Sequence, residues 1–174
     1  MDTSFIITFI GDDRPGLIEE LSGVISDHGG NWQESRLQQL AGKFAGLVAI
    51  TLPSDRGEEL RNAMKALAPR GLSVKVTALE AMPDDSHQGR TIRLAIVGPD
   101  RPGIVREISA ALAQQRINVV DMHSDVSSAP MSAEAMFTAS VEAQIAAQSD
   151  LDELHDKLEE IANQMLVDVH LETD

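Results

Sequence analysis

The chain has 174 residues, no cysteine and a formal net charge of −14, from 14 basic and 28 acidic residues. The absence of cysteine excludes disulfides, zinc–thiolate sites and thiol nucleophiles. The acidic balance argues against direct DNA binding, because DNA-binding proteins contact phosphates with clustered Lys and Arg. No apolar run approaches the roughly 20 residues that span a bilayer, and the N-terminal Met1-Asp2-Thr3-Ser4 lacks the basic region of a signal peptide. We therefore expect a cytoplasmic protein.

The N-terminal residues predict a strand followed by a helix. Residues Phe5 to Ile10 are β-branched and aromatic and are bounded by Gly11, which indicates a short buried strand. Pro15 suits the first position of a helix, where its missing N–H costs nothing. Gly29 and Gly30 tolerate positive φ and are expected to end this helix. Its apolar stripe consists of Leu17, Ile18, Leu21, Val24 and Ile25.

The rest of this half predicts a hairpin, a helix and a strand. Two extended segments, 31–40 and 44–52, flank a turn at Ala41-Gly42-Lys43. Residues 58–68 carry apolar side chains at helical spacing, and residues 71–79 alternate apolar and polar side chains like a half-exposed strand. The order βαββαβ predicts a ferredoxin-like sandwich, with two helices on one face of a four-stranded antiparallel sheet.

The phrase Gly-Asp-Asp-Arg-Pro-Gly-Leu-Ile at Gly11–Ile18 returns as Gly-Pro-Asp-Arg-Pro-Gly-Ile-Val at Gly98–Val105, so the chain is an internal duplication. The elements predicted in the second copy are 91–97, 102–115, 118–126, 133–141, 150–164 and 166–171. Residues 81–90 are polar and broken by Pro and Gly, as in a linker. We therefore expect an α+β protein of two domains, 1–80 and 91–174.

The repeated Asp-Arg-Pro-Gly phrase supplies a candidate ligand site. It stands where a strand turns into a helix, so unpaired N–H groups of the first turn attract a carboxylate or phosphate. Glycine lets a ligand approach the backbone, and arginine adds a charged fork. The alternative is structural: the aspartates favour the helix dipole and the arginines lie in solvent. The candidate residues are Asp13, Arg14, Pro15, Gly16 and Leu17, and Asp100, Arg101, Pro102, Gly103 and Ile104.

Asn31 and Asn118 are further candidates, because each stands between the first helix and the second strand of its copy. An amide both donates and accepts hydrogen bonds, which suits the ammonium and carboxylate of an amino acid. The alternative for both is a turn residue that tolerates left-handed φ.

Other residues that often carry chemistry indicate none here. The histidines have no metal-ligand spacing, and no Gly-x-Ser-x-Gly, Walker or Gly-x-Gly-x-x-Gly motif occurs. We therefore expect no metal, no cofactor and no enzymatic activity. Trp32 is expected to cover the sheet or a domain interface, and Met122, Met131 and Met136 to fill gaps in the core.

The order βαββαβ, with Asp-Arg-Pro-Gly between the first strand and helix and Asn before the second strand, resembles the ACT domain. The resemblance covers nearly the whole chain, twice. It implies binding of an amino acid, with glycine among the candidates, at domain or subunit interfaces near this loop and this asparagine. Because such small sandwiches leave apolar surface uncovered, we expect two chains to form a homodimer.

A stand-alone tandem pair of this length resembles the family of glycine cleavage system transcriptional repressors. This implies a sensor that acts on a transcription activator through protein contact, without touching nucleic acid or membrane. The alternative is a regulatory accessory subunit of an amino-acid metabolic enzyme, such as the small subunit of acetolactate synthase. Such subunits resemble a single ACT domain followed by a different domain, and the return of the motif at Asp100 argues against them.

Overall fold

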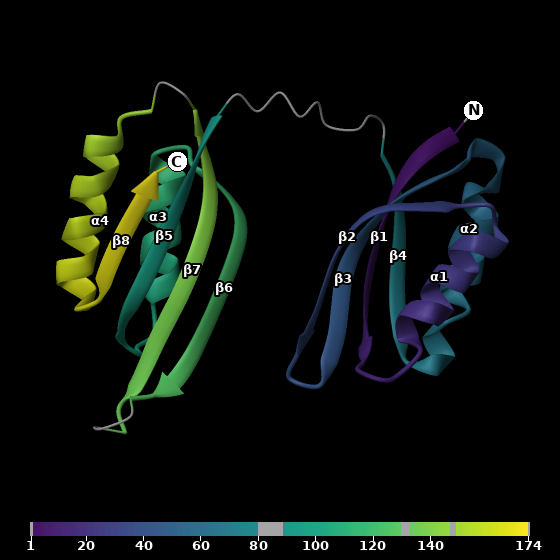
Figure 1. Cartoon of the computed structure of the whole chain (residues 1–174), viewed down its shortest axis with the longest axis horizontal. Helices are drawn as coiled ribbons and strands as arrows, with labels where there is room; N and C mark the ends of the chain where they lie inside the picture. The colour runs from purple at the N-terminus through teal and green to yellow at the C-terminus, as the bar shows by residue number, and fades with distance from the viewer. Residues whose placement is uncertain (1, 80–88, 130–132, 147–148, 174) are drawn as a thin grey trace. The chain divides into compact units, whose positions relative to one another are not determined.

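Each half of the chain folds as a βαββαβ unit with its own sheet (Figure 1), so the predicted α+β architecture of two ferredoxin-like sandwiches is confirmed. The computed structural model describes residues 2–79, 89–129, 133–146 and 149–173. The chain divides into a first unit, Met1–Asp84, and a second unit, Asp85–Asp174.

In the first unit the sheet has the strand order β2-β3-β1-β4, and neighbouring strands are antiparallel. Both helices cover the same face of this sheet (Figure 1). The elements are β1 (Asp2–Asp12), α1 (Leu17–Asp27), β2 (Asn31–Leu40), β3 (Lys43–Pro53), η1 (Ser54–Arg56), α2 (Gly57–Lys65), η2 (Ala68–Arg70) and β4 (Leu72–Ala78).

The second unit repeats this topology, with the strand order β6-β7-β5-β8 and two helices on one face (Figure 1). Its elements are β5 (Gly89–Pro99), α3 (Ile104–Gln114), β6 (Asn118–Ser128), β7 (Ala135–Ala146), α4 (Leu151–Met165) and β8 (Asp168–Thr173). Gly89 and Arg90, which were expected in the linker, belong to β5, where they pair with Ala146 and Ile145 of β7. The rest of the expected linker, 81–88, lies outside the described residues.

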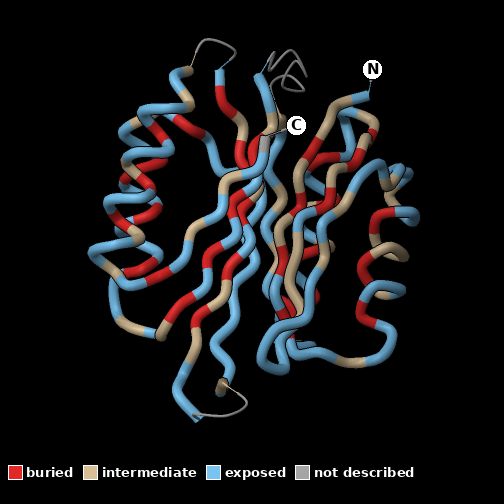
Figure 2. Tube along the Cα trace, turned by 60° about the vertical axis from the view of Figure 1, so that its left-hand side comes forward, coloured by how far each residue is buried: buried red, intermediate tan, exposed pale blue. Residues whose placement is uncertain are grey.

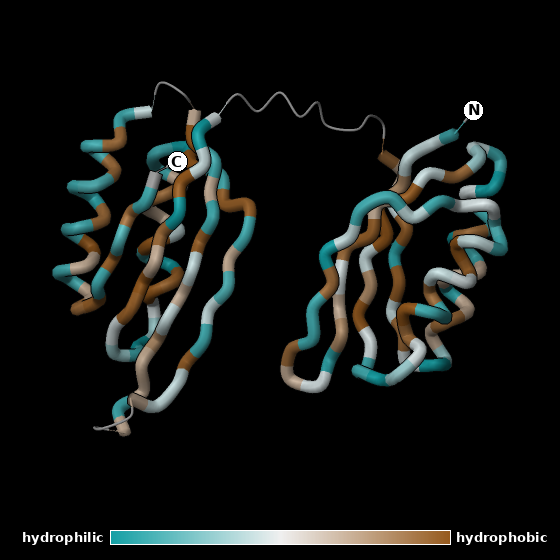
Figure 3. The backbone as a smooth tube through the Cα atoms, in the orientation of Figure 1, coloured by the Kyte–Doolittle hydropathy of each residue, from teal (hydrophilic) through white to brown (hydrophobic). Residues whose placement is uncertain are grey.

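Each unit buries its own apolar core between the sheet and its helices. Buried and exposed residues alternate along the central strands (Figure 2), and hydrophobic residues recur along the strands of both sheets (Figure 3). The segment Phe5 to Ile10 is therefore buried on one face only: Phe5, Ile7 and Phe9 lie in the core, whereas Ile10 is 50% exposed. The reason is that the helices cover only one face of the sheet.

The two side-chain predictions outside the loop have different outcomes. Trp32 is partly buried and packs against the core of the first unit, as expected of a residue that covers the sheet. Met122 fills a gap over the core only in part, since it lines an apolar hollow in the second unit but is 37% exposed on the edge strand β6. Met131 lies outside the described residues.

The first helix starts two residues later than its proline suggested, and it ends before Gly29, as expected. Pro15 does not open α1, because Gly16 follows it in the left-handed region, with φ of 84°, and helical geometry begins at Leu17. At the other end, Gly29 takes a positive φ of 76° but Gly30 does not. Gly30 is needed for space, since a Cβ there would lie 2.8 Å from Cγ2 of Ile25.

Candidate functional site

The two Asp-Arg-Pro-Gly loops adopt the same backbone geometry in both units. Gly16 and Gly103 are the N-caps of α1 and α3, with φ of 84° and 102°. Each uses its carbonyl oxygen to accept the first helical hydrogen bond, from the N–H of Glu20 or Glu107, at 2.9 Å in both units. Neither helix has a side-chain cap. The first-turn N–H groups of both helices are therefore not capped by a side chain, which leaves the predicted anion site compatible with the structure.

Each loop is fixed to the neighbouring hairpin of its own sheet. The N–H of Asp13 donates to the carbonyl of Gly42 at 3.0 Å, and the N–H of Asp100 donates to the carbonyl of Ala135 at 2.8 Å. After the loop, Leu17 and Ile104 are buried in the cores. Leu17 and Ile104 can therefore contact a ligand only through their backbone groups, because their side chains pack in the cores.

The charged groups differ between the units. In the first unit Glu20, whose side chain is only 15% exposed, pairs with Arg14 of the loop and also accepts from Arg70 Nη1 at 2.5 Å. Hydrogen bonds from Arg14 and then Arg70 hold the pKa of the Glu20 carboxyl below its usual value. The charge of Arg14 is therefore neutralised by Glu20. Arg14 does not lie free in solvent, which was the structural alternative, and it does not offer an unpaired charge to a ligand.

In the second unit the loop arginine has a different setting. Within the part of the chain that the structure describes, Arg101 forms no ion pair. The position that follows η2 in the first unit is Gly71, with φ of 81°, and its counterpart after α4 is Leu166, with φ of 55°. The residue before this left-handed position is Arg70 in one unit and Met165 in the other. The second loop therefore lacks the arginine that completes the network of the first.

Sequence reasoning missed Glu20 and Arg70 as residues that act on the loop. Glu20 carried a weak signal, since it lies one turn into the helix that the loop precedes. Arg70 carried none, because the contact joins residues far apart in the chain and depends on the packing of η2 beside α1.

Asn31 and Asn118 are the first residues of the edge strands β2 and β6. Neither has a positive φ; the left-handed positions of these turns are Gly29 and Arg116. The interpretation of the asparagines as left-handed turn residues is therefore wrong. Both side chains are exposed, and neither makes a hydrogen bond to any described residue.

Within one unit the loop and the asparagine lie at opposite ends of the sheet. Asn31 pairs with Thr51, which pairs in turn with Ser4 near the start of β1, whereas the loop follows Asp12. At about 3.3 Å per residue, Ser4 and Asp12 are about 26 Å apart along the strand. A free amino acid cannot bridge this distance, so the candidate residues of one unit do not form one site.

Among residues 2–79, 89–129, 133–146 and 149–173, no group of three His, Asp or Glu side chains is placed to hold a metal ion. No helix in the described ranges is long and apolar enough to cross a membrane.

Comparison with known proteins assigns both units to one kind of domain. Residues 3–77 match one ACT domain model and residues 92–159 match another. A structure of an unknown protein from Galdieria sulphuraria covers 100% of this chain and 99% of its own, with a TM-score of 0.87 and 24% identity. A candidate glycine cleavage system transcriptional repressor covers 100% of this chain and 98% of its own, with a TM-score of 0.74 and 17% identity. At these identities the likeness shows a shared fold. No curated protein matches the sequence.

Proposed function

The chain belongs to the ACT domain family, with one ACT domain in each unit, and we propose that it is an amino-acid-sensing repressor of the glycine cleavage system. ACT domains are regulatory and typically bind small amino-acid ligands. The glycine cleavage target is suggested by the full-length likeness to a candidate repressor of that system. In this proposal the chain works in the cytoplasm, without catalysis, by contacting a DNA-binding activator.

The observation that carries the proposal is the duplicated left-handed glycine before each first helix. Because Gly16 and Gly103 have no side chain and a Cβ at either would meet no atom closer than 3.9 Å, the space beside the first-turn N–H groups is open. These N–H groups favour an anion. An α-carboxylate is the anion that every amino acid shares, so such a loop suits a sensor of amino acids.

The separation of loop and asparagine supports a homodimer. The amide and the loop are too far apart in one unit to touch the same ligand, so a ligand that contacts both takes one group from outside that unit, and in the proposed homodimer the partner chain supplies it. Apolar residues on the uncovered face of the first sheet, Ile10 and Leu47, favour such an association, since exposed apolar surface stabilises protein contacts. Light scattering should give a dimer in the micromolar range; a stable monomer would remove the shared site.

The net charge of −14 supports action through protein rather than DNA. We therefore expect the purified chain to leave duplex DNA unshifted at physiological salt. Salt-sensitive micromolar binding by the protein alone would overturn this part of the proposal.

The site is tested by variants assayed with calorimetry. Asn118→Ala removes a polar partner, and Gly103→Val places a branched side chain beside the first helical turn. Each should weaken amino-acid binding about 10- to 100-fold, because an unpaired polar contact costs roughly 1–3 kcal/mol. Asn31→Ala and Gly16→Val test the first unit in the same way. Melting temperatures separate lost binding from lost folding, and unchanged affinity in all four folded variants would place the ligand elsewhere.

The partner is tested by capture on the tagged chain. A DNA-binding activator of glycine cleavage genes, retained in an amino-acid-dependent manner, is the expected result. A large catalytic subunit in its place would support the accessory-subunit alternative and contradict the transcriptional role.

A further inference from the structure

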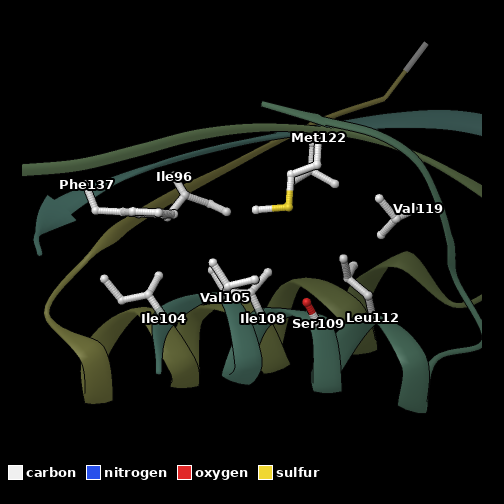
Figure 4. Close-up of a pocket in the computed structure, with 10 residues that line it drawn as sticks. Ile96, Ile104, Val105, Ile108, Ser109, Leu112, Val119, Met122 and Phe137 are labelled. Atoms are coloured by element: carbon white, nitrogen blue, oxygen red, sulfur yellow. The ribbon is translucent and has the colours of Figure 1, made fainter. Parts of the chain in front are cut away.

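The second unit contains an apolar hollow between α3 and the edge strand β6 (Figure 4). Side chains of Val119 and Met122 face the helix from the strand, and Val105, Ile108 and Ser109 rise from α3 on the opposite side. The hollow measures about 270 Å³ when the open solvent at its mouth is included, but the space that it leaves for the centre of a water molecule is only about 10 Å³. That is the space of about one water molecule.

The hollow exists because two aromatic residues of the first unit have aliphatic counterparts in the second. The strands β2 and β6 share a bulge at the same place, between Trp32 and Glu34 and between Val119 and Asp121, so Val119 replaces Trp32. In the central strands Phe9 is opposite Gly46, and Ile96 is opposite Ala139 at the equivalent rung, so Ile96 replaces Phe9.

In the first unit these aromatic rings complete the packing. Trp32 packs against the core, and the ring of Phe9 lies 5.9 Å from that of Phe44, between centroids. In the second unit Phe137 corresponds to Phe44, but no aromatic ring stands in place of Phe9 or of Trp32. Val119 remains 41% exposed at the mouth. The internal repeat thus shows the kind of group that belongs in this space: an apolar side chain that enters from the strand edge.

Met122 stands where the first unit has Ser35, opposite Val141 and Val48 respectively. It partly fills the hollow and is itself partly exposed. Methionine is unbranched and adapts to irregular spaces. Rotation of its side chain would enlarge the hollow without moving the backbone. Any ligand larger than water requires such an enlargement, because the hollow now has room for the centre of about one water molecule.

We infer that the second unit, and not the first, takes the apolar side chain of an amino acid into this hollow, with Met122 displaced and the Ser109 hydroxyl at the rim. The inference rests on the proposed function and narrows its ligand to aliphatic or thioether amino acids rather than glycine, which has no side chain to fill the space. The loop charge agrees with this asymmetry: Arg14 is neutralised by Glu20, whereas no described residue pairs with Arg101.

The test is calorimetric titration of the full chain with L-leucine, L-isoleucine and L-methionine, with glycine and L-serine as comparators. The apolar amino acids should bind at least tenfold more tightly than glycine, since burying an aliphatic side chain accounts for a factor of ten or more. Val119→Trp restores the residue of the first unit and should weaken leucine binding at least tenfold. Val120→Trp is the matched control, because Val120 is the next residue of the same strand and does not line the hollow.

A second variant, Ser109→Leu, fills the hollow from the helix and should have the same effect; Ser22→Leu is its control in the first unit. In a sample labelled at the methionine methyl carbons, leucine should shift the Met122 resonance saturably. Glycine binding as tight as leucine, or leucine binding unaffected in both folded hollow-filling variants, would overturn the inference while the sensor function stands. Failure of every amino acid to bind the wild-type chain would overturn both.

Discussion

Replacing Gly16 by alanine should destabilise the first unit through the backbone alone. A Cβ added at Gly16 would meet only Oε2 of Glu19, at 4.0 Å, so no steric contact contributes. The left-handed φ of 84° is the whole cost, and for a residue with a Cβ it is about 1–2 kcal/mol. Gly23 provides the matched control, because it lies inside α1 with nothing within 4 Å of an added Cβ and no positive φ. Gly23→Ala should stabilise by about 0.5–1 kcal/mol.

The two variants therefore change stability in opposite directions, although both add one methyl group to open space. Trp32 is the only tryptophan, and it packs in the first unit, so its fluorescence reports the unfolding of that unit by urea or heat. Each kcal/mol should move the midpoint by about 4–8 °C in a domain of this size. If Gly16→Ala unfolds at the wild-type temperature or above it, the left-handed loop is not the conformation in solution, and the argument for an open first turn fails.

Three further outcomes are expected. Leu21→Ala should lower the free energy of unfolding by about 2–5 kcal/mol, because the Leu21 side chain is 0% exposed. Leu40→Ala is the control: the Leu40 side chain is 74% exposed, so the urea midpoint followed by Trp32 fluorescence should not change. Asp150→Ala should cost about 1 kcal/mol, measured by helical circular dichroism, because its carboxylate caps α4 at 2.9 and 3.2 Å. Since two arginines lower the pKa of Glu20, the stability that this ionised carboxylate gives to the first unit is complete above its ordinary pKa of 4.5 and is lost as the pH falls below that value. In a plot of the urea midpoint against pH, Glu20→Gln should reduce the decline over this acidic range.

The topology followed from the sequence because its signals are local and occur twice. The apolar stripe from Leu17 to Ile25 and the β-branched run before Gly11 each fix one element, and the repeated phrase fixes their order. The exact ends of the helices were harder to predict from the sequence. Pro15 is compatible with a first helical position, but Gly16 takes a left-handed φ, so the helix begins two residues later. The loop is also held by the Gly42 carbonyl, which accepts from the N–H of Asp13, a contact between residues far apart in the sequence.

The candidate site was predictable only in part. The loop glycines follow from their place in the sequence, whereas the pairing of Glu20 with Arg70 depends on tertiary packing. The distance between the loop and Asn31 follows from the strand order. β3 lies between β1 and β2 and is antiparallel to both, so the start of β2 lies at the same end of the sheet as the start of β1, away from the loop. The contrast of Trp32 with Val119 was visible in the repeat, but its meaning required the register of the two bulged strands.

The central claim is that this chain senses an amino acid, and titration of the purified full-length chain with each of the twenty amino acids tests it most directly. Calorimetry near neutral pH should show saturable binding of a small subset, and that binding should weaken about 10- to 100-fold when Asn118 or Gly103 is replaced. An absence of binding by all twenty at millimolar concentration, in a chain shown by its melting temperature to be folded, would contradict the claim.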